Sequence, residues 1–129
     1  VTGGDPLCFT ARGPDDPAVA AFRAASERAG LSAEDANQRL GEALGRVLER
    51  ALRAGPWRRA VVSGGDTSGH VVRQLGLYAL TALAPVAPGA ALCRAHSDDP
   101  AFDGLELALK GGQMGDVGYV AQVRQGGAG

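Results

Sequence analysis

Apolar residues recur at helical spacing through the first half of the chain and predict two helices. The first begins at Pro17, behind an aspartate that can cap free N–H groups, and stops at Gly30. The second begins at Ser32 and ends at Gly55 and the proline that follows it. Each helix has one apolar face, formed by Ala18, Phe22, Ala25 and Ala29 in the first and by Leu40, Leu44, Val47, Leu48 and Ala51 in the second.

Short apolar runs of strand length alternate with glycine-rich turns in the second half. We expect strands over residues 60–62, 77–84, 90–95 and 105–109, a helical segment closed by Gly76, and a last short helix over about 117–124. In the last strand, leucines alternate with Glu106 and Ala108, which predicts a half-buried strand with Glu106 facing solvent. Helices that alternate with strands predict the α/β class, as a single compact domain with a mixed or parallel sheet flanked by helices.

Charge and composition argue against several functions. Thirteen Lys+Arg against fourteen Asp+Glu give a net charge of -1, so we expect no nucleic-acid binding, which depends on a basic surplus. No segment approaches the roughly 20 apolar residues that span a bilayer, and we expect no membrane association. The two cysteines and two histidines match no metal-ligand spacing, so no metal site is expected in the protein itself. We interpret Cys8 and Cys93 as free thiols in the cytoplasm.

The first candidate site is the glycine turn over residues 63–69, between a predicted strand and a predicted helix. Gly64 and Gly65 leave room for a phosphate, and the hydroxyls of Thr67 and Ser68 can donate to it at a helix N-terminus. Asp66 is unexpected beside phosphate. It is explained as a helix cap, as a ligand of Mg²⁺ carried by a nucleotide, or as a base that activates a hydroxyl.

The second candidate site is the turn over residues 110–115, which follows the last predicted strand. Lys110 can neutralise phosphate charge, and Gly111 and Gly112 permit close backbone approach. Taken alone, each turn is more typical of an ordinary loop than of a binding site. Two such turns after strands in an α/β chain favour a ligand site, because open α/β sheets bind ligands beyond the carboxyl ends of their strands.

The residues of both turns resemble a known family. Residues 61–69 are similar to the GG(E/D)T(S/A)G stretch in the nucleotide-binding domain of the four-carbon acid sugar kinase family. Residues 107–115 are similar to the family's LALKSGNFG signature, and residues 88–94 to its PG-x-x-x-x-R segment. The resemblance runs in consistent order over roughly residues 7–120. Three residues depart from the second signature: Gly111, Gln113 and Met114.

The resemblance implies the C-terminal, nucleotide-binding domain of a two-domain kinase. Such an enzyme uses ATP with Mg²⁺ to phosphorylate the terminal hydroxyl of a four-carbon sugar acid such as threonate, erythronate or a 3-oxo-tetronate. The family's sugar-acid-binding N-terminal domain is expected to be absent from this chain, so the isolated domain is expected to be inactive. The resemblance implies nucleotide contacts for Gly64, Gly65, Asp66, Thr67 and Gly112. Together with Ser68, Lys110 and Gly111, which the two turns themselves indicate, these residues form the expected nucleotide site, with Asp66 as the expected catalytic residue.

A second hypothesis stays open at this point. The chain could be a non-catalytic α/β module that senses an anion or a nucleotide. Asp66 together with Lys110 discriminates the two hypotheses, because a pure anion binder has little use for a carboxylate. Homodimer formation is also left open, and the sugar acid is not identified.

Overall fold

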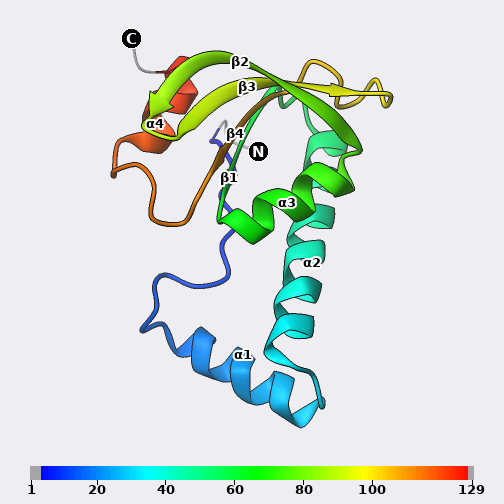
Figure 1. Ribbon diagram of the computed structural model, residues 1–129, viewed down its shortest axis with the longest axis vertical. Helices are drawn as coiled ribbons and strands as arrows, with labels where there is room; N and C mark the ends of the chain where they lie inside the picture. Colours follow the sequence, from blue (N-terminus) through cyan, green and yellow to red (C-terminus); the bar gives the residue numbers. More distant parts are fainter. Residues whose placement is uncertain (1–3, 128–129) are drawn as a thin grey trace. The chain divides into compact units, whose positions relative to one another are not determined.

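The computed structural model describes residues 4–127 (Figure 1). The elements follow the order α1 (Pro17–Arg28), α2 (Ala33–Ala54), β1 (Arg59–Ser63), α3 (Gly65–Gln74), β2 (Leu77–Ala87), β3 (Ala90–Ser97), β4 (Glu106–Lys110) and α4 (Tyr119–Gln125). The chain divides into two compact units, the first ending at Asn37 and the second beginning at Gln38. No helix among the described residues is long and apolar enough to cross a bilayer.

The first unit contains α1 and the start of α2. The Asp16 carboxylate caps α1 by accepting the Ala18 N–H at 2.9 Å. This bond makes the largest contribution to lowering the pKa of Asp16, and a second hydrogen bond, from the Arg12 N–H, lowers it further. Gly30 follows the helix with φ +69, a conformation that favours glycine. The predicted start and stop of the first helix are therefore confirmed.

The second helix also begins and ends where the sequence predicts. Ser32 Oγ accepts the Asp35 N–H at 3.0 Å and so satisfies one free donor of the first turn of α2. At the other end, the Gly55 N–H donates to Ala51 O at 3.1 Å. Glu49 and Arg53, four residues apart near that end, form an ion pair at 3.2 Å.

The second unit is built on a four-stranded mixed sheet of order β1-β4-β3-β2. β1 pairs with β4 in parallel, whereas β3 pairs antiparallel with both β4 and β2. The carboxyl ends of β1 and β4 therefore lie at one edge of the sheet, which also carries the tight turn between β2 and β3. The α/β class and the mixed sheet flanked by helices are confirmed. β2 is longer than predicted and extends through Pro85 to Ala87.

Two cores lie on opposite faces of the sheet because successive strand residues point to opposite sides. The core on the α3 side also takes in the last turns of α2, and the core on the α4 side packs beneath α4. The α3-side core comprises Leu52, Ala60, Val62, Val71, Leu75, Leu77, Ala95, Phe102, Leu105 and Leu107. The α4-side core comprises Val86, Ala90, Leu92, Ala108, Tyr119 and Val123.

Glu106 corrects one expectation. The alternation with leucines predicted a solvent-facing side chain, but Glu106 lies on the α4 face, half-buried, and forms an ion pair with Arg59 of β1. Arg59 also donates to the last carbonyls of α4, Val123 O and Arg124 O, at 2.9 Å each. The strand pattern located the alternation correctly but could not identify the helix that covers this face.

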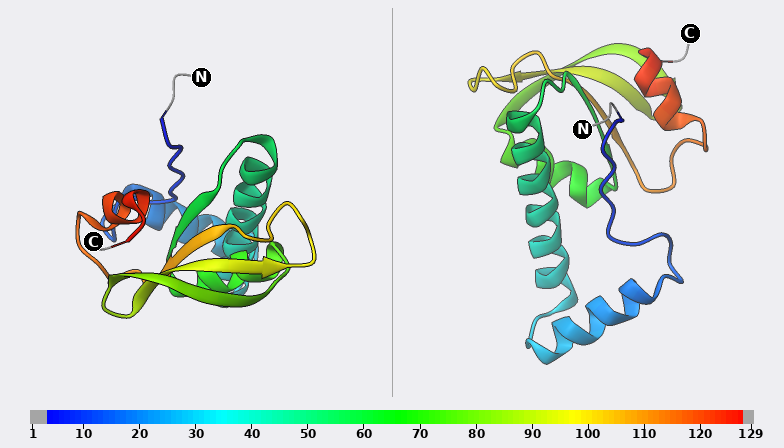
Figure 2. Two further views of the ribbon diagram at one scale, coloured as in Figure 1. Left: turned by 90° about the horizontal axis from the view of Figure 1, so that it is seen from above. Right: turned by 180° about the vertical axis from the view of Figure 1, so that it is seen from behind.

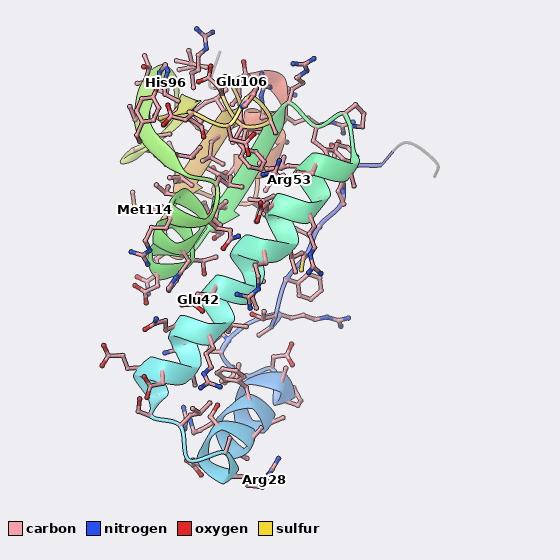
Figure 3. All side chains as sticks on the ribbon, turned by 90° about the vertical axis from the view of Figure 1, so that its right-hand side faces the viewer. Arg28, Glu42, Arg53, His96, Glu106 and Met114 are labelled. Carbon is pink, nitrogen blue, oxygen red and sulfur yellow. The ribbon has the colours of Figure 1, made fainter. Side chains whose placement is uncertain are left out.

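The loop after β3 is held to the end of α2 by charge. Arg53, which projects from the last turns of α2 (Figure 3), donates to Asp99 Oδ2 at 2.6 Å. Its guanidinium also lies 4.5 Å from the centre of the Phe102 ring, within the range of a cation–π contact. The loop is thereby fixed against the α3-side core.

Helices α2 and α3 approach closely where glycines line α2. A Cβ built on Gly41 would overlap the His70 ring, and one built on Gly45 would lie 3.2 Å from Gln74 Cβ. Gln74 also donates to Glu49 Oε2 at 2.5 Å, which joins the two helices further along. The position of α3, and hence of its N-terminus, depends on this glycine-lined contact.

We expect the effect of Gly41→Ala on the free energy of unfolding to change sign when His70, the residue opposite, is removed. Alanine gains about 1 kcal/mol of helix propensity over glycine, whereas its overlap with the His70 ring costs about 1–3 kcal/mol. The single variant should therefore have a lower free energy of unfolding than the wild type, or at best an equal one. In a His70→Ala background, Gly41→Ala should be stabilising. Denaturant unfolding of the four proteins measures the coupling, and additive effects would contradict the close approach.

Candidate functional site

The two glycine turns lie side by side at one edge of the sheet. Ser63 and Lys110 are the last register partners of the parallel strands β1 and β4. Directly beyond them, the Gly64 N–H donates to Lys110 O at 2.9 Å, so one hydrogen bond joins the two turns. Figures 1 and 2 show the start of α3 and the segment after β4 at the same end of the sheet. The structure thus brings together the two segments that the sequence singled out separately.

The first turn presents the N-terminus of α3 at this edge. Gly64 occupies the N-cap position with φ +114, and no side chain makes a cap hydrogen bond there. The first intrahelical bond is the Ser68 N–H to Gly64 O at 2.9 Å. The N–H groups of Gly65, Asp66 and Thr67 therefore have no partner inside the helix and point out of its positive end.

The two glycines of this turn serve different purposes. The positive φ belongs to Gly64 alone, whose added Cβ would lie 3.3 Å from Thr67 Oγ1. Gly65 is already helical and has an ordinary φ, and no described atom lies within 4 Å of a Cβ built on it. Gly64 is needed for the turn, whereas Gly65 opens onto free space at the helix N-terminus.

The polar residues of the turn differ in what they leave available. Asp66 is exposed in the first turn of α3 and makes no side-chain hydrogen bond or ion pair within residues 4–127. The cap explanation for Asp66 is therefore wrong in this structure. Ser68 differs from Asp66, since its hydroxyl donates to Gly64 O at 2.7 Å within its own helix.

The second turn holds its lysine close to its own backbone. Lys110 Nζ donates to Gly111 O at 2.9 Å and to Gly112 O at 3.3 Å. Gly112 is exposed, and no described atom lies within 4 Å of a Cβ built on it. The ammonium charge therefore stays at the turn, beside the edge where α3 begins.

Two contacts that the sequence did not indicate shape the second turn. A Cβ built on Gly89, in the turn between β2 and β3, would overlap the Met114 side chain. Tyr119, the first residue of α4, is fully buried, and Lys110 Nζ lies 5.7 Å from the centre of its ring. Burial, and to a lesser extent the Cys93 thiol, raises the pKa of Tyr119. No motif signalled either contact, because both join segments that are distant in sequence or separated by a turn.

The described residues contain no group of three or more His, Cys, Asp or Glu side chains that could hold a metal ion. A metal at this edge would have Asp66 as its only carboxylate from the first turn and would need other ligands. Mg²⁺ is commonly bound in this way, through one or two carboxylates, waters and the phosphates of a nucleotide. The donors present therefore fit a metal that arrives with a nucleotide.

Comparison with known proteins gives consistent matches. A family model described as "Nucleotide-binding C-terminal domain" matches residues 1–120. The chain is 48% identical over 120 residues to a 3-oxo-isoapionate kinase of Paraburkholderia graminis, covering 93% of the chain and 26% of that protein. It is 35% identical over 112 residues to a 3-oxo-tetronate kinase of Pseudomonas fluorescens, covering 87% of the chain and 23% of that protein. The chain thus spans a minor part of the curated relatives it matches.

Two crystal structures share the fold. A Haemophilus influenzae protein matches with a TM-score of 0.64 at 20% identity, over 83% of this chain and 24% of that one. A Bordetella bronchiseptica domain, crystallised with bound citrate as a domain-swapped dimer, matches with a TM-score of 0.59 at 25% identity, over 90% of this chain and 30% of that one.

We expect Gly65→Val to fold normally and to lose affinity for any anion bound at the start of α3. A Cβ built on Gly65 meets no described atom within 4 Å and the position requires no unusual φ, so we expect the fold to accept a side chain there. The same space is where an anion would contact the helix N–H groups. Gly69→Val, one turn further along the same helix and also in open space, is the matched control.

Binding of Mg-ADP by the two variants, measured by calorimetry on protein with wild-type circular dichroism, tests this expectation. Loss of affinity in Gly65→Val alone supports a site at the helix N-terminus. Equal affinity in both variants would place the bound nucleotide elsewhere. Unfolding of Gly65→Val would show that this glycine has a structural role.

Proposed function

This chain belongs to the four-carbon acid sugar kinase family, as its nucleotide-binding C-terminal domain, and on that premise we propose that it binds ATP for transfer of the γ-phosphoryl group to a four-carbon sugar acid. The acceptor is the terminal hydroxyl of an acid of the threonate, erythronate or 3-oxo-tetronate type. The names of the curated relatives, which include 3-oxo-isoapionate kinase and 3-oxo-tetronate kinase, support this substrate class.

The observation that carries the proposal is the hydrogen bond from the Gly64 N–H to Lys110 O. This bond places a helix N-terminus and a lysine-bearing glycine turn next to each other at the carboxyl ends of two parallel strands. Free N–H groups, a helix dipole and an ammonium group all favour negative charge at this end of the sheet. A triphosphate chain has the charge and the length to contact both turns.

The chain's own residues have separate roles in this proposal. The N–H groups of Gly65, Asp66 and Thr67 bind phosphate oxygens, and Lys110 neutralises charge from the neighbouring turn. Asp66 lies at the same helix start, and its carboxylate has no partner among the described residues. There it either holds Mg²⁺ carried by the nucleotide or accepts the proton of the attacking hydroxyl. Bound Mg²⁺ would supply charge neutralisation at the phosphates.

The acceptor substrate is proposed to bind to the remainder of the enzyme. The chain covers only 26% and 23% of the two kinases to which it was compared, so most of each relative lies outside the matched region. In an enzyme with the activity of these relatives, a sugar-binding domain would then face the carboxyl ends of β1 and β4.

We expect this chain alone to bind Mg-ADP weakly and to transfer no phosphate. Binding follows from the two turns, and the weakness follows from the small share of the related kinases that this chain covers. Titration calorimetry with millimolar Mg-ADP on folded protein should give a saturable heat, and coupled assays with threonate, erythronate and 3-oxo-tetronate should give no turnover. Absence of binding would contradict the proposed site, and turnover would contradict the need for a second domain.

In an enzyme that carries this domain together with its sugar-binding part, we expect Asp66→Asn to lower kcat far more than it raises the KM for ATP. A carboxylate that holds the metal or accepts the proton acts most strongly as the phosphoryl group moves. Loss of a general base costs about 10²–10⁴-fold in rate. An Asp66→Asn enzyme within about threefold of wild type would assign the catalytic group to another residue.

Lys110→Met is expected to behave differently in the same enzyme. The lysine neutralises phosphate charge that is present before the reaction begins, so its loss should raise the KM for ATP as well as lower kcat. Steady-state kinetics of the two variants side by side separate the roles. An unchanged KM in Lys110→Met would show that the ammonium group does not contact bound ATP.

A further inference from the structure

We propose that Tyr119 is a positioning residue of the nucleotide site, and that its aromatic ring holds the ammonium group of Lys110 at the phosphate-facing edge of the sheet. This inference rests on the proposed function, because it concerns how the second turn presents its charge. It assigns a role to a residue of α4, outside both glycine motifs. The role belongs to the ring face and not to the hydroxyl group.

The Lys110 side chain is held by three contacts. Lys110 Nζ lies 5.7 Å from the centre of the Tyr119 ring and donates to Gly111 O and Gly112 O. An ammonium group within about 6 Å of a ring centre is attracted by the negative ring face. The ring and two carbonyls thus restrict a side chain that would otherwise have four freely rotating bonds. Such restriction lowers the entropy lost when the lysine pairs with phosphate.

The ring itself is fixed from several sides. Tyr119 is 1% exposed and belongs to the α4-side core. Gly115, with φ +78, passes so close that an added Cβ would lie 2.8 Å from Tyr119 Cδ2. The Tyr119 N–H donates to Asp116 O at 3.1 Å, and Asp116 Oδ1 accepts the Gly118 N–H at 2.8 Å. The second turn is therefore folded directly onto this ring.

The C-terminal end of helix α4 is anchored to β1, which fixes the position of the Tyr119 ring relative to the strands. Arg59 of β1 donates to Val123 O and Arg124 O at 2.9 Å each and forms an ion pair with Glu106 of β4. Arg59 and Lys110 lie at opposite ends of the β1–β4 pair, on the face that α4 covers. Cations at the carboxyl end of a helix are stabilised by its dipole.

The hydroxyl group of Tyr119 makes no contribution that the structure can account for. Its oxygen is buried and has no hydrogen-bond partner among the described residues. A buried polar atom without a partner is a cost to stability, so removing it while keeping the ring should be harmless or favourable. This separates Tyr119→Phe, which keeps the ring, from Tyr119→Leu, which removes it.

A cycle of variants of this chain tests the proposal, with Mg-ADP affinity measured by calorimetry. Tyr119→Leu should raise the Kd by about two- to fivefold, the range of a cation–π contact, whereas Tyr119→Phe should leave it within twofold of wild type. In a Lys110→Met background, Tyr119→Leu should have no further effect on the Kd. The matched control is Val123→Ala, which creates a cavity in the same helix and core, at the end of α4 bound by Arg59, and should lower stability without changing the Kd.

The outcomes separate the two levels of the argument. If the wild-type protein does not bind Mg-ADP, the proposed function itself is wrong. If the wild type binds but Tyr119→Leu binds equally well, or loses affinity equally with and without Lys110, the ring has no role in positioning the lysine. An equal loss of affinity in Val123→Ala would mean that general loosening of α4 explains the effect.

A measurement on the wild type keeps the proposal testable if Tyr119→Leu does not fold. Lys110 is the only lysine in the sequence, so labelling with ¹³C-lysine gives a single ε-methylene signal in NMR spectra. A methylene group over an aromatic ring face is shifted upfield by the ring current. An upfield signal that persists in Tyr119→Phe supports the contact, and a random-coil position in the wild type overturns it.

Discussion

The parallel pairing of β1 with β4 is the constraint on which the candidate site depends. These strands are separated by α3, β2 and β3 in the sequence, yet their register makes Ser63 and Lys110 partners at one edge of the sheet. The Gly64 N–H to Lys110 O bond continues that pairing by one step into the turns. Without it, a helix N-terminus and a basic glycine turn would be two unrelated loops.

The packing of the second unit supports this edge from both faces. On one face, glycines of α2 allow α3 to approach closely, and the Arg53–Asp99 contact fixes the loop after β3. On the other face, Arg59 anchors α4, whose first residue lies beneath the second turn. Each turn therefore rests on a different helix, and the hydrogen bond between the turns joins the two sides.

The sequence predicted what depends on local patterns. Apolar spacing and caps gave both early helices, as the Asp16 and Ser32 contacts confirm, and glycines after strands indicated both turns. The sequence could not predict which partners individual side chains contact. The Ser68 hydroxyl bonds to its own helix, Lys110 bonds to its own turn, and Glu106 is covered by α4. Each of these contacts depends on backbone geometry or on an element distant in the sequence, and residue spacing gives no information on either.

We propose that a nucleotide's phosphates bind between the start of α3 and the turn after β4. Backbone amide shifts in ¹⁵N–¹H spectra of this chain during titration with Mg-ADP test it most directly. We predict the largest shifts at Gly65, Asp66 and Thr67 together with Gly111 and Gly112, since these amides lie where the two turns are joined. Large shifts confined to one turn, or to residues far from both, would contradict a site formed by the two turns.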